Sequence, residues 1–163
     1  MKSTEFIPTK IYTRKELAIQ IIRWRLKNKK IVFTNGVFDI VHEGHISSLS
    51  ESASFGDILI VAVNSDASVK RLKGPARPVN VEQSRALVLA SLVMTDAIVI
   101  FEEDTPRELI TLLMPDILVK GGDYKIDEIA GAKEVLEHGG EVRLSAIIPG
   151  ISTTEIIRKM KEQ

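Results

Sequence analysis

The chain contains no cysteine in its 163 residues, which excludes a disulfide scaffold and a thiol nucleophile. It also lacks an excess of either charge, because 22 Lys and Arg balance 22 Asp and Glu. A formal charge of zero argues against a nucleic acid or an anionic membrane as the main partner. It leaves room for a small phosphorylated substrate, which needs only a local basic cluster.

Long apolar runs are also missing. No run approaches the length of a membrane-spanning helix, and residues 1–10 lack the apolar region of a signal peptide. These absences predict a cytoplasmic protein with no membrane partner. Without internal repeats or low-complexity segments, a chain of this length is expected to form one domain that buries roughly 70% of its unfolded surface.

Short apolar runs alternate with amphipathic segments, a pattern typical of strands that alternate with helices. Residues 58–63 are apolar at every position, as expected for a strand buried on both faces of a parallel sheet. This order predicts an α/β fold with a Rossmann-like, doubly wound parallel sheet in a single domain. The expected strands are residues 30–34, 58–63, 97–101, 117–120 and 141–146, and the expected helices are residues 13–28, 45–55, 66–72, 81–93, 106–114, 128–137 and 152–161.

The first expected helix begins with a capping-box pattern formed by Thr13 and Glu16. Leu17, Ile21 and Trp24 have the spacing of its buried side, and Ile22 is expected at the margin of that side. We divide the chain into an N-terminal segment and helix, residues 1–28, and a main domain, residues 29–163.

The most informative stretch is residues 34–45, which follows an apolar strand and ends in His42 and His45 with Gly44 between them. A spacing of three places both imidazoles on one side of a first helical turn. Unpaired N–H groups at a helix start attract anions, so we interpret the stretch as a phosphate site. A zinc site would need a third ligand, and the chain offers no cysteine and only one further histidine, His138. A purely structural role for the two histidines is the other alternative.

Every unusual loop follows an expected strand. These loops are residues 34–45, 64–66, 121–123 and 149–154. In parallel sheets ligands bind beyond the carboxyl ends of the strands, where the strand order reverses. Four such loops therefore predict one binding edge. The dinucleotide fingerprint G-x-G-x-x-G is absent, so NAD binding is not expected.

Hydroxyl and basic side chains supply two further candidate phosphate contacts. Residues 150–154 open a helix with three hydroxyl side chains, and Arg158 follows one turn later. A well-capped helix with a solvated arginine is the alternative. Lys73, Arg77 and Arg85 form a second basic cluster, although each is also suited to an exposed surface. No nucleophile with an adjacent base is evident, which favours transfer at phosphorus, where positioning and charge do most of the work.

Two signatures resemble the nucleotidyltransferase superfamily marked by H-x-G-H and a late I-S-S/T-T-x-x-x-R. They stand at residues 42–45 and 151–158. Residues 34–45 also match T-x-G-x-F-D-x-x-H-x-G-H of its cytidylyltransferase-like branch. Longer runs are similar to the D-glycero-β-D-manno-heptose 1-phosphate adenylyltransferases, and the resemblance covers residues 29–160. These runs are residues 61–74, 77–80, 101–106, 118–124 and 139–142.

The resemblance implies that AMP passes from ATP to the sugar 1-phosphate, with release of pyrophosphate and formation of ADP-heptose for surface glycan synthesis. It also implies Mg²⁺ that is bound mainly through substrate phosphates, with no protein metal ligand. In many bacteria this activity is one half of a bifunctional kinase–adenylyltransferase, and the chain is expected to be the stand-alone form. Residues 75–76 depart from the family pattern, which leaves the sugar selectivity open.

The resemblance assigns catalytic roles to His42, His45, Lys73 and Arg158. Asp39 is expected to shape the loop or touch the acceptor rather than to act as a general base. The residues expected to contact the substrates are Thr34, Asn35, Gly36, Phe38, Asp39, Gly44, Asn64, Asp66, Arg77, Lys120, Gly121, Asp123, Ser152, Thr153 and Thr154.

Two rival functions share the same signatures. One is a cytidylyltransferase for glycerol 3-phosphate or a related phosphoalcohol, and the other is a catalytically silent nucleotide sensor. A homo-oligomer is expected, because relatives pair and residues 88–93 are apolar, although a buried core helix has the same pattern.

Overall fold

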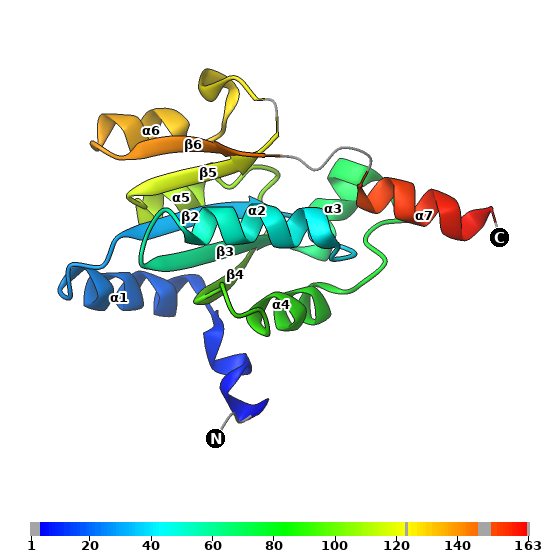
Figure 1. Cartoon of the computed structure of the whole chain (residues 1–163), viewed down its shortest axis with the longest axis horizontal. Coiled ribbons are helices and arrows are strands. Elements are labelled where there is room, and N and C mark those ends of the chain that lie inside the picture. Colours follow the sequence, from blue (N-terminus) through cyan, green and yellow to red (C-terminus); the bar gives the residue numbers. More distant parts are fainter. Residues whose placement is uncertain (1–3, 123, 147–150, 163) are drawn as a thin grey trace.

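A computed structural model of the chain describes residues 4–122, 124–146 and 151–162 (Figure 1). Within these residues, six parallel strands form one sheet in the order β1-β4-β3-β2-β5-β6, with helices on both faces. The strands are β1 (Ile11–Tyr12), β2 (Ile31–Gly36), β3 (Ile58–Asn64), β4 (Ala97–Phe101), β5 (Ile117–Gly121) and β6 (Glu141–Ser145). The helices are α1 (Arg14–Arg25), α2 (Glu43–Ala53), α3 (Asp66–Lys73), α4 (Glu82–Ala90), α5 (Arg107–Leu113), α6 (Ala132–Glu137) and α7 (Thr153–Lys161), with the 3₁₀ turns η1 (Thr4–Phe6), η2 (Pro8–Lys10) and η3 (Ile126–Glu128). The expected single-domain α/β fold is confirmed.

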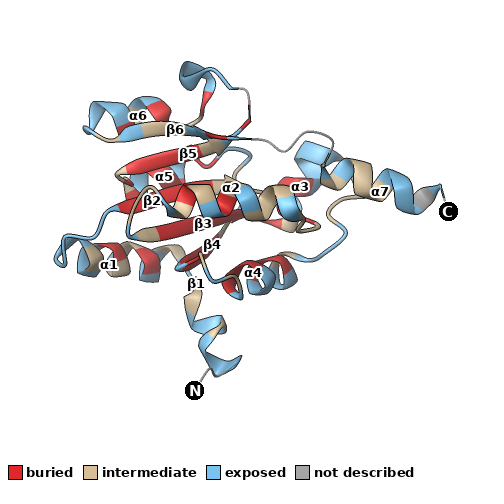
Figure 2. Cartoon of the chain, viewed as in Figure 1, coloured by how far each residue is buried: buried red, intermediate tan, exposed pale blue. Residues whose placement is uncertain are grey.

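Each face of the sheet has its own apolar core, because successive strand residues point to opposite faces. Leu17 of α1 shares one buried cluster with Phe33 of β2 and with residues of α5 and α6. Leu49 of α2 and Leu89 of α4 share the other cluster with Val32 of β2. Figure 2 shows the buried strands between these two helical layers. Burial on both faces explains why the central strands are almost continuously apolar.

The strand order reverses at β2. From β2 the chain continues to β3 and β4 on one side, whereas β5 and β6 lie on the other side. The register places Thr34 of β2 beside Val61 of β3 and Val119 of β5. The loops that follow β2 and β5 therefore diverge at neighbouring strand ends, which is where open α/β sheets bind ligands.

The edge strand β1 was not expected from the sequence. Ile11 and Tyr12 pair in parallel with β4, and a strand of two residues is too short to produce a recognisable pattern. Lys10, which precedes it, donates to the carbonyl oxygen of Thr95 at 2.7 Å. These contacts join the N-terminal segment to the sheet that the remainder of the chain builds.

Helix α1 begins as predicted, since Thr13 and Glu16 form a complete capping box. Leu17 and Ile21 are buried, as expected. The prediction for Ile22 was wrong, because its side chain is 59% exposed. Position 22 lies about 100° around the helix from position 21, just beyond the strip that faces the sheet.

Two helices are shorter than the sequence pattern suggested. Helix α4 ends at Ala90, and Val93 beyond it is 93% exposed. The helix expected at residues 128–137 is instead η3 followed by α6. Gly131 separates them with a φ of 85°, and a Cβ atom there would lie 2.7 Å from Ile110. This left-handed conformation next to α5 requires glycine and interrupts the helix.

Three aspartates at the amino edge of the sheet accept hydrogen bonds from backbone N–H groups at the start of neighbouring strands. Each aspartate immediately precedes a strand, and its carboxylate accepts from an N–H group at the start of the neighbouring strand that the parallel ladder leaves unpaired. The pairs are Asp57 with Lys30 (2.8 Å), Asp96 with Leu59 (2.8 Å) and Asp116 with Ile31 (2.7 Å).

We expect Asp116→Ala to lower the free energy of unfolding by about 1–3 kcal/mol, because the buried N–H of Ile31 loses its acceptor. Urea denaturation followed by circular dichroism measures the loss. Asp127→Ala in η3 is the matched control, since Asp127 is exposed, and it should change stability by less than about 0.5 kcal/mol. Equal effects in the two variants would contradict the role given to the edge aspartates.

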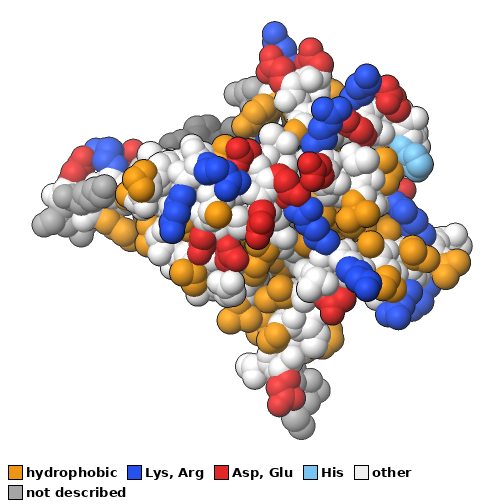
Figure 3. Space-filling model, turned by 180° about the vertical axis from the view of Figure 1, so that it is seen from behind, with side chains coloured by type: hydrophobic (Ala, Val, Ile, Leu, Met, Phe, Trp, Pro, Cys, Tyr) orange, Lys and Arg blue, Asp and Glu red, His pale blue; other side chains and the backbone are white. Residues whose placement is uncertain are grey.

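The surface mixes charges of both signs. Figure 3 shows acidic and basic side chains interspersed on the face turned away from the viewer in Figure 1. Surface ion pairs such as Arg71–Asp104 contribute little to stability. In the described part of the chain, no helix has both the length and the apolar character needed to cross a bilayer.

Candidate functional site

A cavity of about 370 Å³ lies beyond the carboxyl edge of the sheet, and both sequence signatures line it. One wall is the segment from β2 to the first turns of α2, and another is the start of α7. The end of α3 and the loop after it add basic side chains. The predicted residues that line this cavity are Phe38, Asp39, His42, Gly44, His45, Lys73, Arg77, Gly121, Ser152, Thr153 and Thr154.

A second, smaller cavity of about 190 Å³ adjoins the first, since Phe38, His45 and Gly121 line both. It lies at the ends of β2 and β5, where the strand order reverses. The predicted residues that line only this cavity are Thr34, Asn35, Gly36 and Lys120.

The two signatures are in direct contact. The hydroxyl of Thr153 donates to the carbonyl oxygen of Ile40 at 3.2 Å, although 113 positions separate them in sequence. Ser152 caps α7 as predicted, because its hydroxyl accepts from the N–H of Glu155 at 3.1 Å. The start of α7 is therefore held against the loop that leads into His42.

Helix α2 presents its start to the cavity without a side-chain cap. His42 is the N-cap residue with an extended backbone, and its side chain makes no capping hydrogen bond. Gly44 keeps this turn open, because a Cβ atom there would lie 3.1 Å from the His42 ring. Unpaired N–H groups at the start of an eleven-residue helix favour an anion in the cavity.

The two histidines form a stacked pair. Their ring centroids are 3.8 Å apart with an interplanar angle of 25°, and Phe38 contacts His45 edge-on at 5.2 Å. The Nδ1 atoms of both rings are buried, and among the described residues neither has a hydrogen-bond partner. A buried polar atom without a partner is costly, so this pair is suited to a polar ligand.

Burial lowers the pKa of His45 to about 4, and the neighbouring His42 adds to the shift. Burial also lowers the pKa of His42, with a small opposing effect from Glu43. Both rings are therefore neutral near pH 7, and each has one N–H to donate. A neutral pair that donates without a net charge is compatible with close stacking, whereas two charged rings would repel each other.

We expect His45 to make the fold less stable in acid. In the unfolded chain its pKa is about 6.5, so between pH 6.5 and 4 the unfolded state binds more protons than the folded state. Stability therefore falls as the pH falls through this window. In thermal unfolding, the advantage of the wild type over His45→Asn should be larger at pH 7 than at pH 4.5. A difference that is the same at both pH values would contradict the assignment.

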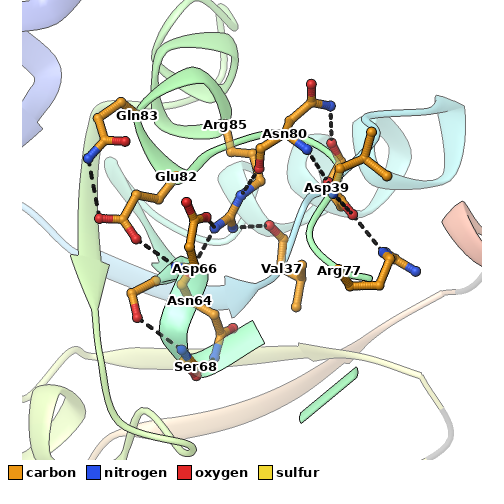
Figure 4. A network of polar contacts seen from close by, with 12 residues as sticks. Val37, Asp39, Asn64, Asp66, Ser68, Arg77, Asn80, Glu82, Gln83 and Arg85 are labelled. Carbon is orange, nitrogen blue, oxygen red and sulfur yellow. Dashed lines mark hydrogen bonds and ion pairs between the residues drawn. The ribbon is translucent and has the colours of Figure 1, made fainter. Parts of the chain in front are cut away.

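Asp39 is fully engaged by the loop that carries Arg77. Its carboxylate accepts from the N–H groups of Val79 and Asn80, both at 2.9 Å, and from Nε of Arg77 at 2.7 Å (Figure 4). Burial alone would raise its pKa, but these hydrogen bonds outweigh burial and lower it. A buried carboxylate with a lowered pKa is a poor general base, in agreement with the loop-shaping role expected for it.

Arg85 is not an exposed basic residue, and the structure corrects its assignment to the basic cluster. Its side chain is fully buried, and it pairs with Asp66 at 2.8 Å. It also donates to the carbonyl oxygens of Val37 (2.6 Å), Asn64 (2.8 Å) and Asn80 (2.9 Å) (Figure 4). Arg85 thus connects the loop of residues 34–45, the end of β3 and the loop before α4.

Asn64 and Asp66 belong to this structural network and line neither cavity. The amide of Asn64 donates to the hydroxyl of Ser68 at 3.1 Å, and Asp66 is held by Arg85. Their predicted contact with substrate is therefore not supported by their positions. The loop after β3 ends in a buried network because α4 packs over it.

Arg158 is not among the predicted residues that line the two cavities of the site. Its guanidinium pairs with Glu155 and Glu162 of the same helix region, both at 2.5 Å, and it does not line the described cavities. These two carboxylates raise its pKa. Two acidic residues one turn away on either side compete for a cation that the sequence pattern assigned to phosphate. Asp123, also predicted to contact substrate, lies outside the described residues.

Several lining residues were not predicted. Ser48 lines both cavities and shares a 2.6 Å hydrogen bond with Ser145 of β6. Its position three residues after His45, on the same side of α2, was a usable signal. Tyr124 lines the smaller cavity, where Lys120 lies 5.5 Å from the centre of its ring. Burial lowers the pKa of Lys120.

The described residues offer no group of three or more His, Cys, Asp or Glu side chains that could hold a metal. Among the described residues that line the larger cavity, Asp39 is the only one with a carboxylate, and its oxygens are already engaged.

The largest described cavity, of about 860 Å³, lies elsewhere, between η3, α6 and the start of α5. Its lining includes Ile126, Ile129 and Leu136 but none of the residues predicted to bind substrate. Size therefore does not identify the functional site, whereas the convergence of imidazoles, hydroxyls and cations does.

Sequence comparison places the site in a known context. The Cytidylyltransferase-like family matches residues 33–159. The chain is 53% identical over 152 residues to the bifunctional protein HldE of Escherichia coli O157:H7 (strain EC4115 / EHEC), covering 93% of this chain and 32% of that protein. It is 50% identical over 158 residues to the bifunctional protein HldE of Koribacter versatilis (strain Ellin345), covering 97% and 32%. The chain therefore spans about a third of the length of these relatives.

Solved structures agree with this. The lipopolysaccharide core biosynthesis protein from Thermoplasma volcanium GSS1 is 33% identical with a TM-score of 0.60, and the match covers 74% of this chain and 97% of that one. Pantoate-beta-alanine ligase from Francisella tularensis, at 17% identity and a TM-score of 0.59, shares the fold alone. With a family match over most of the chain and both signatures at one cavity, the chain belongs to the cytidylyltransferase-like family.

Proposed function

We propose that the chain transfers AMP from ATP to D-glycero-β-D-manno-heptose 1-phosphate, giving ADP-heptose and pyrophosphate for lipopolysaccharide or surface glycan synthesis. The observation that carries the proposal is the single cavity lined by the stacked His42–His45 pair, the hydroxyl-rich start of α7 and the cations Lys73 and Arg77. The identity to the HldE proteins and the likeness to a lipopolysaccharide core biosynthesis protein support the heptose branch.

The chemistry needs no covalent enzyme intermediate. An oxygen of the sugar phosphate attacks the α-phosphorus of ATP, a new P–O bond forms, and the bond to the leaving pyrophosphate breaks. No proton has to leave the attacking group, because a phosphate monoester is already ionised near pH 7. The lowered pKa of Asp39 is consistent with a reaction that uses no carboxylate base.

The protein contributes positioning and charge. His42 and His45 donate to oxygens of the nucleotide phosphates, and the start of α2 adds its free N–H groups. Lys73 and Arg77 meet the transferring or leaving phosphates, and Thr153 and the neighbouring hydroxyls hold the β- and γ-phosphates. Mg²⁺ carried with ATP neutralises phosphate charge and is held mainly by phosphates and water.

Residues of β2 and β5 form the remaining wall. Thr34, Asn35, Gly36 and Phe38 surround the α-phosphate, and Lys120 of β5 lines the same smaller cavity. The contribution of Arg158 requires that its pairs with Glu155 and Glu162 open, and its role stays a prediction. So do the cytoplasmic location and the homo-oligomer.

The purified protein should be incubated with Mg²⁺, with ATP or CTP, and with either heptose 1-phosphate or glycerol 3-phosphate. Pyrophosphate release and mass spectrometry of the product report the reaction. We expect ADP-heptose from ATP and the β-anomer as the dominant product. CDP-glycerol as the dominant product would replace the proposal with the cytidylyltransferase. Tight ATP binding without pyrophosphate from any acceptor would replace it with a nucleotide sensor.

A further inference from the structure

Asn80 connects two polar networks that meet beside the cavity (Figure 4). Its backbone N–H donates to the carboxylate of Asp39 at 2.9 Å, and its side-chain amide donates to the carbonyl oxygen of Asp39 at 2.6 Å. Its own carbonyl oxygen accepts from Nε of the buried Arg85 at 2.9 Å. Asn80 is thus held by the buried Arg85 through its carbonyl oxygen, and it holds Asp39 through its two N–H donors.

The carboxylate of Asp39 in turn orients Arg77. The side chain of Asp39 is fully buried, that of Arg77 is 16% exposed, and Nε of Arg77 lies 2.7 Å from the carboxylate. Within residues 4–122, 124–146 and 151–162, no hydrogen bond occupies the two terminal nitrogens of Arg77, and Arg77 lines the larger cavity. A guanidinium fixed at Nε has its other edge free for bidentate contact with a phosphate.

The backbone that leads into the histidine pair is also held by these hydrogen bonds. The carbonyl oxygen of Asp39 accepts from Asn80, and the next carbonyl, that of Ile40, accepts from Thr153 of α7. Two consecutive peptide groups just before His42 are therefore held by two segments that are distant in sequence. The loop of residues 74–80 and the start of α7 fasten the same short stretch from different sides.

We propose that Asn80 is a positioning residue: it fastens the loop of residues 74–80 to Asp39, so that Arg77 presents its free edge to the transferring or leaving phosphates in the larger cavity. This inference rests on the proposed function. Asn80 itself lines neither described cavity, so it acts through Asp39 and Arg77. Lys73 is exposed at the end of α3, which makes Arg77 the one of the two cations whose orientation the fold sets.

The contribution of the Asn80 side-chain amide can be tested separately from that of its backbone N–H. Any residue other than proline at position 80 keeps the backbone N–H that reaches the Asp39 carboxylate, whereas only the side chain of Asn80 reaches the Asp39 carbonyl. Asn80→Ala therefore removes one hydrogen bond and leaves the ion pair in place. Asn80→Asp keeps the shape but replaces the donor with an acceptor that faces a carbonyl oxygen, and it should be the more harmful of the two.

Steady-state kinetics with heptose 1-phosphate and ATP test the proposal. We expect Asn80→Ala to lower kcat/KM for ATP about 5- to 10-fold, with KM for the sugar phosphate within about twofold of wild type. Gln83→Ala is the matched control, because Gln83 is an exposed amide nearby on α4. A rise in KM for the sugar phosphate with no change in kcat/KM for ATP would overturn the proposal.

A double-mutant cycle distinguishes positioning from a general loss of structure. If Asn80 acts through Arg77, then Asn80→Ala should have almost no further effect on kcat/KM for ATP in an Arg77→Ala background. Losses that multiply in the double variant would mean that the two residues act independently, and the proposal would fail.

One readout does not depend on turnover. In ¹⁵N NMR spectra of the intact protein, the Nε–H of Arg77 should exchange slowly with water in wild type and faster in Asn80→Ala and Asn80→Asp. Unchanged exchange in both variants would overturn the role of Asn80. A wild type that transfers AMP to no sugar phosphate would instead refute the proposed function, and this NMR comparison would still report whether Asn80 positions Arg77.

Discussion

Replacing His45 with alanine is expected to lower kcat by about two to three orders of magnitude, the usual loss for one preorganised donor to a transition state. His45 lies in the stacked pair, lines both cavities of the site, and has a buried Nδ1 atom without a partner in the described structure. Charge on the phosphate oxygens is redistributed as the α-phosphorus is attacked, so a donor fixed in place contributes most at that point. The affinity for ATP should change less, because the α2 start, the cations and the α7 hydroxyls still hold the ground state.

Pyrophosphate release under saturating substrates measures kcat, and calorimetric titration with a non-hydrolysable ATP analogue measures affinity. His138→Ala is the control, because His138 is an exposed histidine at the end of α6 and lines neither cavity of the site. It should leave both quantities unchanged. Near-normal turnover in the His45 variant would refute the catalytic assignment, whereas a parallel loss in the His138 variant would point to a general effect on the fold.

Replacing Arg85 with methionine is expected to lower the free energy of unfolding by about 3–5 kcal/mol, the range for breaking a buried ion pair from one side. The guanidinium is completely buried and bonds Asp66 and three backbone carbonyl groups. Methionine fills part of the volume but leaves those acceptors without a donor. Asp66 keeps 27% of its side chain exposed and is partly rescued by water, whereas the carbonyl oxygen of Asn64 is not.

Urea denaturation of both variants and the wild type gives the comparison. Arg71→Met is the matched control, since Arg71 pairs with Asp104 at the surface with half of its side chain exposed. It should change stability by no more than about 1 kcal/mol. Arg85→Lys, which keeps the charge but loses the fork of donors, should fall between the two. A loss in Arg85→Met no larger than in Arg71→Met would show that the buried network contributes little to the fold.

The features that could be predicted from the sequence depend on residues close together in the chain. The capping box of Thr13 and Glu16 and the cap formed by Ser152 each involve positions three apart. The alternation of strands and helices follows from apolar periodicity over a few residues. The two histidines three apart implied a shared face at a helix start, and their rings are stacked there.

The features that escaped prediction depend on partners far away in the chain. Arg77 and Asp39 are 38 positions apart, and Arg85 and Val37 are 48 apart. From the sequence, Arg77 and Arg85 belong to one basic cluster, but packing buries Arg85 and turns Arg77 toward the cavity. Arg158 shows the converse case: Glu155 and Glu162 lie one turn away on the same helix face, so their competition for its guanidinium could have been predicted from the sequence.

Apolar periodicity and local capping were sufficient to specify an α/β chain with two histidines at a helix start, because these effects act within one turn or one strand. They could not specify which charges face the cavity. That outcome depends on the sheet order, which brings together the ends of β2 and β5 and the start of α7. The same order places α4 over the loop of residues 34–45. Burial then removes Arg85 from solvent and fixes Arg77 against Asp39, because a buried charge is stable only where the folded chain supplies its partner.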